Sequence, residues 1–378
     1  MIYIGLAAVT TALAFGADKF RNDILRAVCI AGWILSFCLI AGARDASVGV
    51  DVLVYGYNTY ITASEKDLFA FLGSFYGAKD GVGCALLFWF ATQISCNFGF
   101  FLAIAQLACV APYCVGVYKI SNRTTWFSVL FYALYIFPLS LCLVKQMIAC
   151  SLIFLAVTFM KEQRFKPFLA CVLIATSFHM TALITLLFYP LFNESMKELL
   201  GKQSLFRKQS RACIIVAAAV LLGLVYIFRE PLLLMLSVVK QSYIAQFNSI
   251  SEAHFTFAPL LLLLPLAYVG YIRKRRLSNE AAKREEAIDS AYEASIAFII
   301  FLGFVASELS LISPQLYRVS HYFMILIPMY CGQLIQSKDK KSVALITLGV
   351  VCYFILTVLI QGIGGVEPYT SAFFGLEG

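Results

Sequence analysis

The feature that most constrains this chain is a series of apolar runs long enough to cross a lipid bilayer. The run from Phe98 to Tyr118 has 21 residues and contains no Asp, Glu, Lys or Arg. A membrane-spanning α-helix needs about 20 predominantly apolar residues. Hydrophobic residues make up 61% of the chain and charged residues 13%, proportions that exclude an ordinary soluble domain. The sequence therefore predicts an all-α, polytopic membrane protein.

Apolar runs of this kind recur between polar loops along the whole chain. We place twelve hydrophobic segments in one polytopic membrane domain, residues 1–378. The first lacks the basic region of a signal peptide, so we expect a retained helix. The segments cover residues 1–15, 24–42, 98–118, 125–143, 146–160, a short pair within 167–192, 212–228, 258–272, 295–312, 321–335 and 342–360.

The distribution of Lys and Arg predicts how these segments are oriented. With alternate loops on the cytoplasmic side, 22 of the 29 Lys and Arg residues face the cytoplasm, as the positive-inside rule requires. Both termini then face the outside. Residues 43–82 and 229–257 become outer loops, and the charged segment 273–293 becomes a cytoplasmic connecting helix.

The short pair of segments surrounds His179. Only 26 residues, Pro167 to Phe192, lie between two basic tracts, whereas two full crossings need about 40 apolar residues. We expect two short or re-entrant helices that meet near His179, because broken backbone is tolerated where it lines a cavity. Lys145 also interrupts apolar sequence, and an ionisable group at bilayer depth must face a protein interior or a watery cavity. We take that cavity as the candidate active site.

Seven basic residues stay on the outer side, and four of them lie at or near helix ends. These four are Arg44, Lys145, Arg229 and Arg318. For any one of them, a side chain that reaches toward lipid headgroups is an equally good interpretation. Four together on the face that is poor in positive charge favour an anionic ligand, since Arg and Lys both bind phosphate and pyrophosphate groups.

Two carboxylates lie near these cations in the sequence. Gly49 predicts a tight turn that brings Asp51 close to Arg44, either as a simple surface ion pair or as part of a sugar-binding loop. Glu308 either neutralises Arg318 or stays free to accept a proton.

His179 is our first choice for a general base. An imidazole titrates near neutral pH and can take a proton from an acceptor hydroxyl. The alternative is a histidine that only caps the turn by hydrogen bonding to backbone. Asp51 and Glu308 stay open as rival bases.

Motifs of soluble enzymes and of metal sites are missing from the sequence. There is no P-loop, dinucleotide fingerprint, metal-ligand spacing or serine nucleophile elbow. The twelve cysteines lie within or at the ends of apolar runs, which favours buried free thiols over disulfides or zinc ligands. We expect no cofactor, no bound metal and no nucleic-acid partner.

Three short motifs lie between about Ala41 and Pro328. The first consists of Arg44, Gly49, Asp51 and Tyr55; the second of Lys145 and Gln146, followed by Phe178 and His179; and the third of Arg318, Tyr322 and Phe323. These motifs resemble those of the EpsG-like branch of Wzy-type exopolysaccharide and O-antigen polymerases. The order of the motifs and their membrane context make the resemblance specific. At one position the chain departs from the family, because Lys145 stands where an Arg is usual.

The resemblance implies a metal-independent, inverting glycosyltransferase of the bacterial inner membrane. Donor and acceptor would be undecaprenyl-pyrophosphate-linked oligosaccharides at its outer face, for an O-antigen, a capsule or an exopolysaccharide. Arg44, Lys145 and Arg318 would stabilise the leaving pyrophosphate. Substrate contacts are expected from Gln146, Tyr55, Arg229 and Tyr322.

Two further points stay open. A lipid-linked oligosaccharide flippase or other secondary transporter is the alternative function, because it also needs a basic central cavity. No internal repeat is evident, which weighs against a transporter built from two homologous halves. A chain-length regulator of the same pathway is a partner that the sequence neither requires nor excludes.

Overall fold

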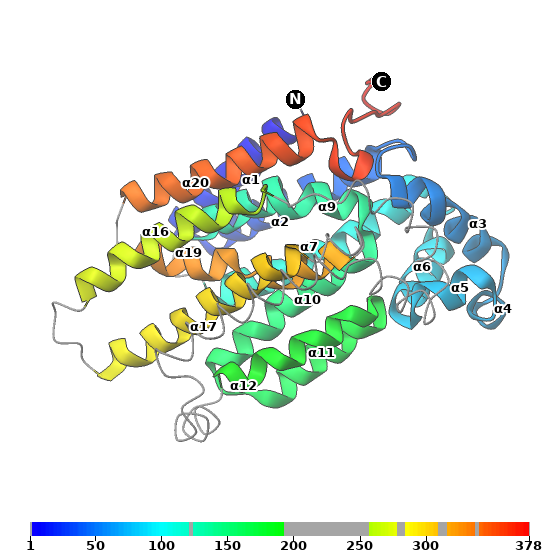
Figure 1. Ribbon diagram of the computed structural model, residues 1–378. Helices are drawn as coiled ribbons and strands as arrows, with labels where there is room; N and C mark the ends of the chain where they lie inside the picture. Colours follow the sequence, from blue (N-terminus) through cyan, green and yellow to red (C-terminus); the bar gives the residue numbers. More distant parts are fainter. Residues whose placement is uncertain are drawn as a thin grey trace. The chain divides into compact units, whose positions relative to one another are not determined.

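The computed structural model describes residues 2–120, 124–192, 257–277, 284–308, 316–336 and 340–377 of the chain. In these residues every regular element is a helix, apart from one isolated bridge between Ser371 and Leu376 (Figure 1). Backbone contacts divide the chain into two compact units, residues 1–186 with 328–378, and residues 187–327. Both boundaries fall inside helices, η3 (Met180–Leu187) and α19 (Ile327–Gln336), so no linker in the sequence marks them.

Unit 1 contains the helical runs that are long and apolar enough to cross a membrane. Among the described residues there are five such runs, which make this a multi-pass membrane protein. They are α1 (Ile2–Lys19), α2 (Asp23–Ala43), α7 (Phe98–Ile120), the run of α8 (Thr125–Phe131), η2 (Tyr132–Ile136) and α9 (Phe137–Cys142), and the run of α20 (Lys340–Phe354) and η7 (Ile355–Ile360).

Shorter helices complete unit 1, and a second set forms unit 2. The shorter helices of unit 1 are η1 (Val52–Gly56), α3 (Tyr57–Glu65), α4 (Leu68–Leu72), α5 (Phe75–Asp80), α6 (Val82–Ile94), α10 (Val144–Lys161), α11 (Phe165–Phe178) and η8 (Ile363–Gly365). Unit 2 contains α12 (Phe188–Phe192), α16 (Leu260–Leu277), α17 (Arg284–Ser307), η6 (Leu316–Ser320) and α18 (His321–Met324). Within unit 2, α17 packs against η6 and α18.

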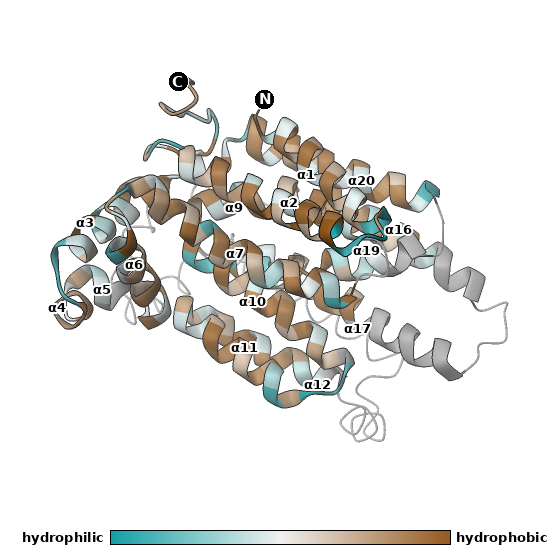
Figure 2. Cartoon of the chain, turned by 180° about the vertical axis from the view of Figure 1, so that it is seen from behind, coloured by the Kyte–Doolittle hydropathy of each residue, from teal (hydrophilic) through white to brown (hydrophobic). Residues whose placement is uncertain are grey.

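The membrane-facing surface of unit 1 is apolar, and its centre is closely packed. Ile4 on α1 and Ile24 and Leu35 on α2 are exposed. Hydrophobic residues cover most of the length of both helices (Figure 2). Lipid tails are the natural neighbours of such side chains, because the helix satisfies its own backbone hydrogen bonds. The run from Thr125 to Cys142 is buried over most of its length and forms the centre of the unit.

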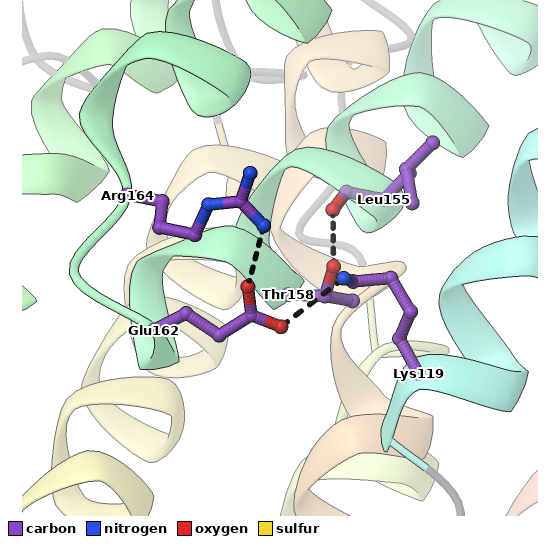
Figure 3. Close-up of polar contacts among 5 residues, drawn as sticks. All are labelled: Lys119, Leu155, Thr158, Glu162 and Arg164. Atoms are coloured by element: carbon purple, nitrogen blue, oxygen red, sulfur yellow. Dashed lines mark hydrogen bonds and ion pairs between the residues drawn. The ribbon is translucent and has the colours of Figure 1, made fainter.

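One end of unit 1 carries basic residues that are predicted to be cytoplasmic. Lys119 at the end of α7 and Arg164 after α10 both pair with Glu162, at 3.1 and 3.2 Å (Figure 3). These hydrogen bonds, above all the one from Lys119, lower the pKa of Glu162. At the same end, the carboxylate of Asp18 accepts a hydrogen bond from the Thr125 N–H at 2.9 Å. Asp18, Lys119 and Glu162, which lie at the ends of α1, α7 and α10, are therefore at the same end of unit 1. That this end faces the cytoplasm stays a prediction.

The opposite end of unit 1 brings together the end of α2, the start of α7 and both termini. Gly42 and Gly99 allow close backbone contact here, since a Cβ on Gly42 would lie 2.7 Å from the Gly99 oxygen. Residues 43–98 therefore leave this end and return to it. The Tyr3 hydroxyl donates to the Val366 oxygen at 2.6 Å, which places the two termini at the same end (Figure 1). That this end faces the outside stays a prediction.

Helices occupy most of the segment 43–82 that was predicted as an outer loop. Asp67 and Ser74 start two of them by accepting hydrogen bonds from the N–H groups of Ala70 and Gly77. The following apolar helix, α6, was not among the predicted segments because its 13 residues are too few for a full crossing. Residues 43–98 return to the end of unit 1 where they began. The alternation of the other segments stays a prediction.

Other predicted features fall wholly or partly outside the described residues. The hydrophobic segment 212–228 is outside them, as is the predicted outer loop 229–257 except for its last residue. Of the predicted connecting helix 273–293, residues 273–277 belong to α16 and residues 284–293 belong to α17. Residues 278–283 between these parts are not described.

Candidate functional site

The candidate site is built on a break between α9 and α10. Leu143 leaves the helical conformation, with φ −92° and ψ 50°, between Cys142 at the end of α9 and Val144 at the start of α10. The Leu141 oxygen at this break accepts a hydrogen bond from Arg44 Nη1 at 2.7 Å. Carbonyl groups in the last turn of a helix lack intrahelical partners and favour a cationic side chain. Arg44 therefore caps the C-terminal end of α9, just before the start of α10, which carries Lys145.

Gly49 brings the first motif against the same carbonyl group. Its φ of +95° is a conformation that side chains with a Cβ rarely adopt, and a Cβ here would collide with the Leu141 oxygen. The Gly49 N–H donates to the Gly365 oxygen at 2.9 Å. The spacing between Arg44 and Gly49 thus follows from their shared contact with Leu141.

One hydrophobic cluster joins the chain neighbours of three predicted site residues. Its buried members include Val52, Tyr60, Cys84, Phe88, Phe101 and Leu102, and the half-buried Val144 and Phe178 pack against them. Val52, Val144 and Phe178 are the direct neighbours of Asp51, Lys145 and His179. The fold of unit 1 therefore brings the neighbours of these three residues to one cluster, although they lie far apart in the sequence.

A buried hydrogen-bond network holds α9 against α7 behind the break. Ser140 Oγ donates to Gln106 Oε1 at 2.9 Å, and Gln106 Nε2 donates to the Tyr132 hydroxyl at 2.8 Å. Gln146, predicted as a substrate contact, is itself almost fully buried on α10. The network was not predicted from the sequence, where its only signal is single polar residues within apolar runs.

Arg44 differs from the prediction in its surroundings. It was expected to point into a vestibule or to form a surface ion pair with Asp51, but it is only 5% exposed and forms no ion pair with a carboxylate among the described residues. The Nε atom of Arg44 is also buried, and it has no hydrogen-bond partner among the described residues. Burial lowers the pKa of Arg44 to about 10, so the side chain stays charged at neutral pH. Among the described residues, Arg44 is therefore a buried cation without a carboxylate counter-ion.

His179 lies at a helix break, as the sequence predicts. It follows α11, and its N–H donates to the Ala175 oxygen at 2.9 Å. The side chain is half-buried, and its Nδ1 lies 2.7 Å from Thr181 Oγ1. When Nδ1 carries the ring proton and donates it to Thr181, the lone pair on Nε2 is the one that can accept a proton. The contact with Thr181 thus helps to fix the orientation of the ring. The role of His179 as a base stays a prediction.

The third motif lies in unit 2. Arg318 is half-buried in η6, whereas Tyr322 in α18 is fully buried. Glu308 directly follows α17 and is also fully buried, with its Oε1 accepting a hydrogen bond from Ser307 Oγ at 3.3 Å. The roles predicted for Arg318, Glu308 and Tyr322 stay predictions.

The structure does not test two of the predicted substrate contacts or the predicted absence of a metal. Arg229 lies outside the described residues, and Tyr55 is described only as part of η1, without its side chain. No group of three or more His, Cys, Asp and Glu side chains within the described ranges is arranged to hold a metal ion. Eleven cysteines are described; none of these forms a disulfide, and most are buried.

Comparison with known protein families gives the chain its classification. A family model described as the EpsG family matches residues 28–371, a range that includes every predicted site residue. No curated protein and no solved structure matches the chain. The match covers nearly the whole sequence and agrees with the resemblance of the three motifs. This polytopic, polysaccharide polymerase-like chain therefore belongs to the EpsG family, a family of Wzy-like polymerases.

Proposed function

We propose that this protein polymerises undecaprenyl-pyrophosphate-linked oligosaccharide repeats at the outer face of the bacterial inner membrane. The observation that carries the proposal is Arg44, a buried, charged side chain without a carboxylate partner among the described residues. Burying an uncompensated charge is costly, and a bound anion offsets that cost. In a family of polysaccharide polymerases, the pyrophosphate of a lipid-linked donor is the anion that suits this site.

Lys145 and Arg44 have different parts in this proposal. Lys145 is half-buried in the first turn of α10, where it can reach a phosphate group as a point charge. Arg44 binds the Leu141 oxygen at the helix break and adds a fixed positive charge. No side chain caps the N-terminus of α10, so the amides of its first turn add positive potential. Arg318 is proposed as a third cation because it belongs to the third family motif.

The proposed transfer exchanges one bond for another at the anomeric carbon of the growing glycan. The acceptor hydroxyl oxygen attacks this carbon from the face opposite the pyrophosphate, which inverts its configuration. The bond to the pyrophosphate oxygen breaks, and its electron pair leaves with undecaprenyl pyrophosphate. Cationic side chains, with no metal ion, stabilise the negative charge that develops there. His179 accepts the hydroxyl proton, with Asp51 and Glu308 as the alternative bases.

Deleting the gene from its native strain tests the proposed function. The expected result is a surface polysaccharide that collapses from a ladder of chain lengths to a single repeat, restored by a plasmid copy. Gel electrophoresis of extracted polysaccharide measures it. A surface that lacks even the single repeat would instead identify the protein as a flippase, and an unchanged ladder would exclude both functions.

Reporter fusions test the sidedness that the proposal needs. Fusions after Lys166 and Lys341 are expected to report the cytoplasm, because these residues lie in basic tracts of the sequence, at the starts of α11 and α20. A fusion after Tyr57, near the Arg44 end of unit 1, is expected to report the outer side. A cytoplasmic signal from the Tyr57 fusion would remove the site from the face where polymerisation is proposed.

A further inference from the structure

The segment that follows the last span packs against the loop that carries Arg44. We call residues 362–376 the tail. The Asp45 N–H donates to the Thr370 oxygen at 3.1 Å, and the Ala372 N–H donates to Asp45 Oδ1 at 3.0 Å. Ser371 Oγ donates to the Ala43 oxygen. The tail therefore binds the residues on both sides of Arg44.

Other contacts of the tail involve residues close to Arg44. The Tyr369 hydroxyl donates to the Ile40 oxygen at 2.7 Å, and the buried Tyr369 lies within electrostatic range of the guanidinium group. The Gly365 oxygen accepts from Gly49, the residue that approaches Leu141. The Val366 oxygen accepts from Tyr3. The tail thus ties the Arg44 loop to the first helix of the chain.

We propose that the tail holds Arg44 in place for the transfer reaction, with Asp45 and Tyr369 as positioning residues. The inference rests on the proposed function. Arg44 must keep its hydrogen bond to Leu141, across 97 positions of sequence, while it presents its charge to the pyrophosphate. The side chain alone cannot fix the backbone from which it extends. The contacts of the tail with Ala43 and Asp45 supply that constraint.

The tail also shields the charge of Arg44 from water. Electrostatic interactions strengthen when water is excluded, because the effective dielectric constant falls. Tyr369 is only 8% exposed, and its ring contacts the ring of the buried Tyr3, with centroids 6.1 Å apart. A displaced tail would both shift Arg44 and weaken its effect on the leaving group.

The experiment measures chain elongation by the purified full-length protein in lipid nanodiscs. Lipid-linked repeat units extracted from the deletion strain serve as donor and acceptor. Asp45→Ala, which removes the acceptor of the Ala372 N–H, is expected to lower turnover about tenfold, with the half-saturating substrate concentration unchanged within about twofold. Asp45→Asn keeps an oxygen at the same position and is expected to retain at least about half of the wild-type turnover.

Two further variants keep the test decisive. Asp67→Ala is the matched control, because Asp67 Oδ1 also accepts one backbone N–H, from Ala70 at 2.9 Å, but away from the tail. It is expected to keep wild-type turnover. Tyr369→Phe removes one hydroxyl while its ring stays against Tyr3, and it is expected to lower turnover about threefold. Equal turnover in Asp45→Ala, Tyr369→Phe and Asp67→Ala would overturn the inference.

A double-mutant cycle separates positioning of Arg44 from general stability. In an Arg44→Lys background, Asp45→Ala is expected to lower turnover by less than about twofold, because the group that it positions has been replaced. Effects that multiply instead would show that the tail acts independently of Arg44, and they would also overturn the inference. Full activity of both Arg44→Lys and Arg44→Gln would contradict the role of Arg44 in the proposed function. Loss of activity in Arg44→Gln without any effect of Asp45→Ala would contradict only the role of the tail.

Discussion

Replacing Arg44 by glutamine is expected to lower polymerisation at least about a hundredfold, the range found when one electrostatic stabiliser of a developing negative charge is removed. The thermal unfolding temperature is expected to stay within about 5 °C of the wild type. Loss of the hydrogen bond to Leu141 destabilises the protein. Loss of a buried, uncompensated charge stabilises it, and the two effects oppose each other.

Arg44→Lys is the matched variant for this prediction. Lysine keeps the positive charge but loses the planar guanidinium group, so we expect at least about tenfold more activity than in Arg44→Gln. The assay is elongation of extracted lipid-linked repeats in nanodiscs, beside thermal unfolding of the same preparations. Equal activity of the two variants would mean that Arg44 serves only to cap α9, and that its charge has no part in the transfer.

Replacing His179 by glutamine is expected to lower turnover at least about a hundredfold at unchanged substrate affinity, because a general base contributes about 10²–10⁴-fold. Glutamine can keep a hydrogen bond to Thr181, which lies 2.7 Å from His179 Nδ1, but it cannot accept the acceptor proton. Single-turnover elongation by purified protein measures the rate of the chemical step. Near-normal turnover in His179→Gln would eliminate His179 and move the role to Asp51 or Glu308.

The pH dependence of turnover provides the control for His179. A base works in its unprotonated form, so the wild-type rate is expected to rise with pH through the pKa of the base. This acidic limb should be missing from the residual activity of His179→Gln. Arg44 does not produce such a limb, because its pKa of about 10 keeps it charged throughout the working range. Asp51→Asn and Glu308→Gln, assayed in parallel, are expected to keep the limb.

Membrane class could be predicted from the sequence because lipid imposes it locally. The uncharged run from Phe98 to Tyr118 corresponds to α7, Phe98–Ile120, since a helix in lipid must satisfy its own backbone hydrogen bonds. Lys119 and Arg164 meet at one end of unit 1, and the positive-inside rule predicts that this end faces the cytoplasm. His179 lies at a helix break for an equally local reason, the shortage of apolar residues between two basic tracts.

The composition of the site was decided only by the tertiary structure. Nothing near Arg44 in the sequence indicates that it caps a helix 97 positions away, or that Gly49 must be a glycine because of Leu141. The role of the tail could not be recognised from a sequence motif. Its contacts with Ala43 and Asp45 use mainly backbone groups, which every residue possesses. Hydrophobic periodicity records which face of a helix is buried. Hydrophobic periodicity does not indicate which distant carbonyl group a buried arginine will bind, since that depends on how the helices pack.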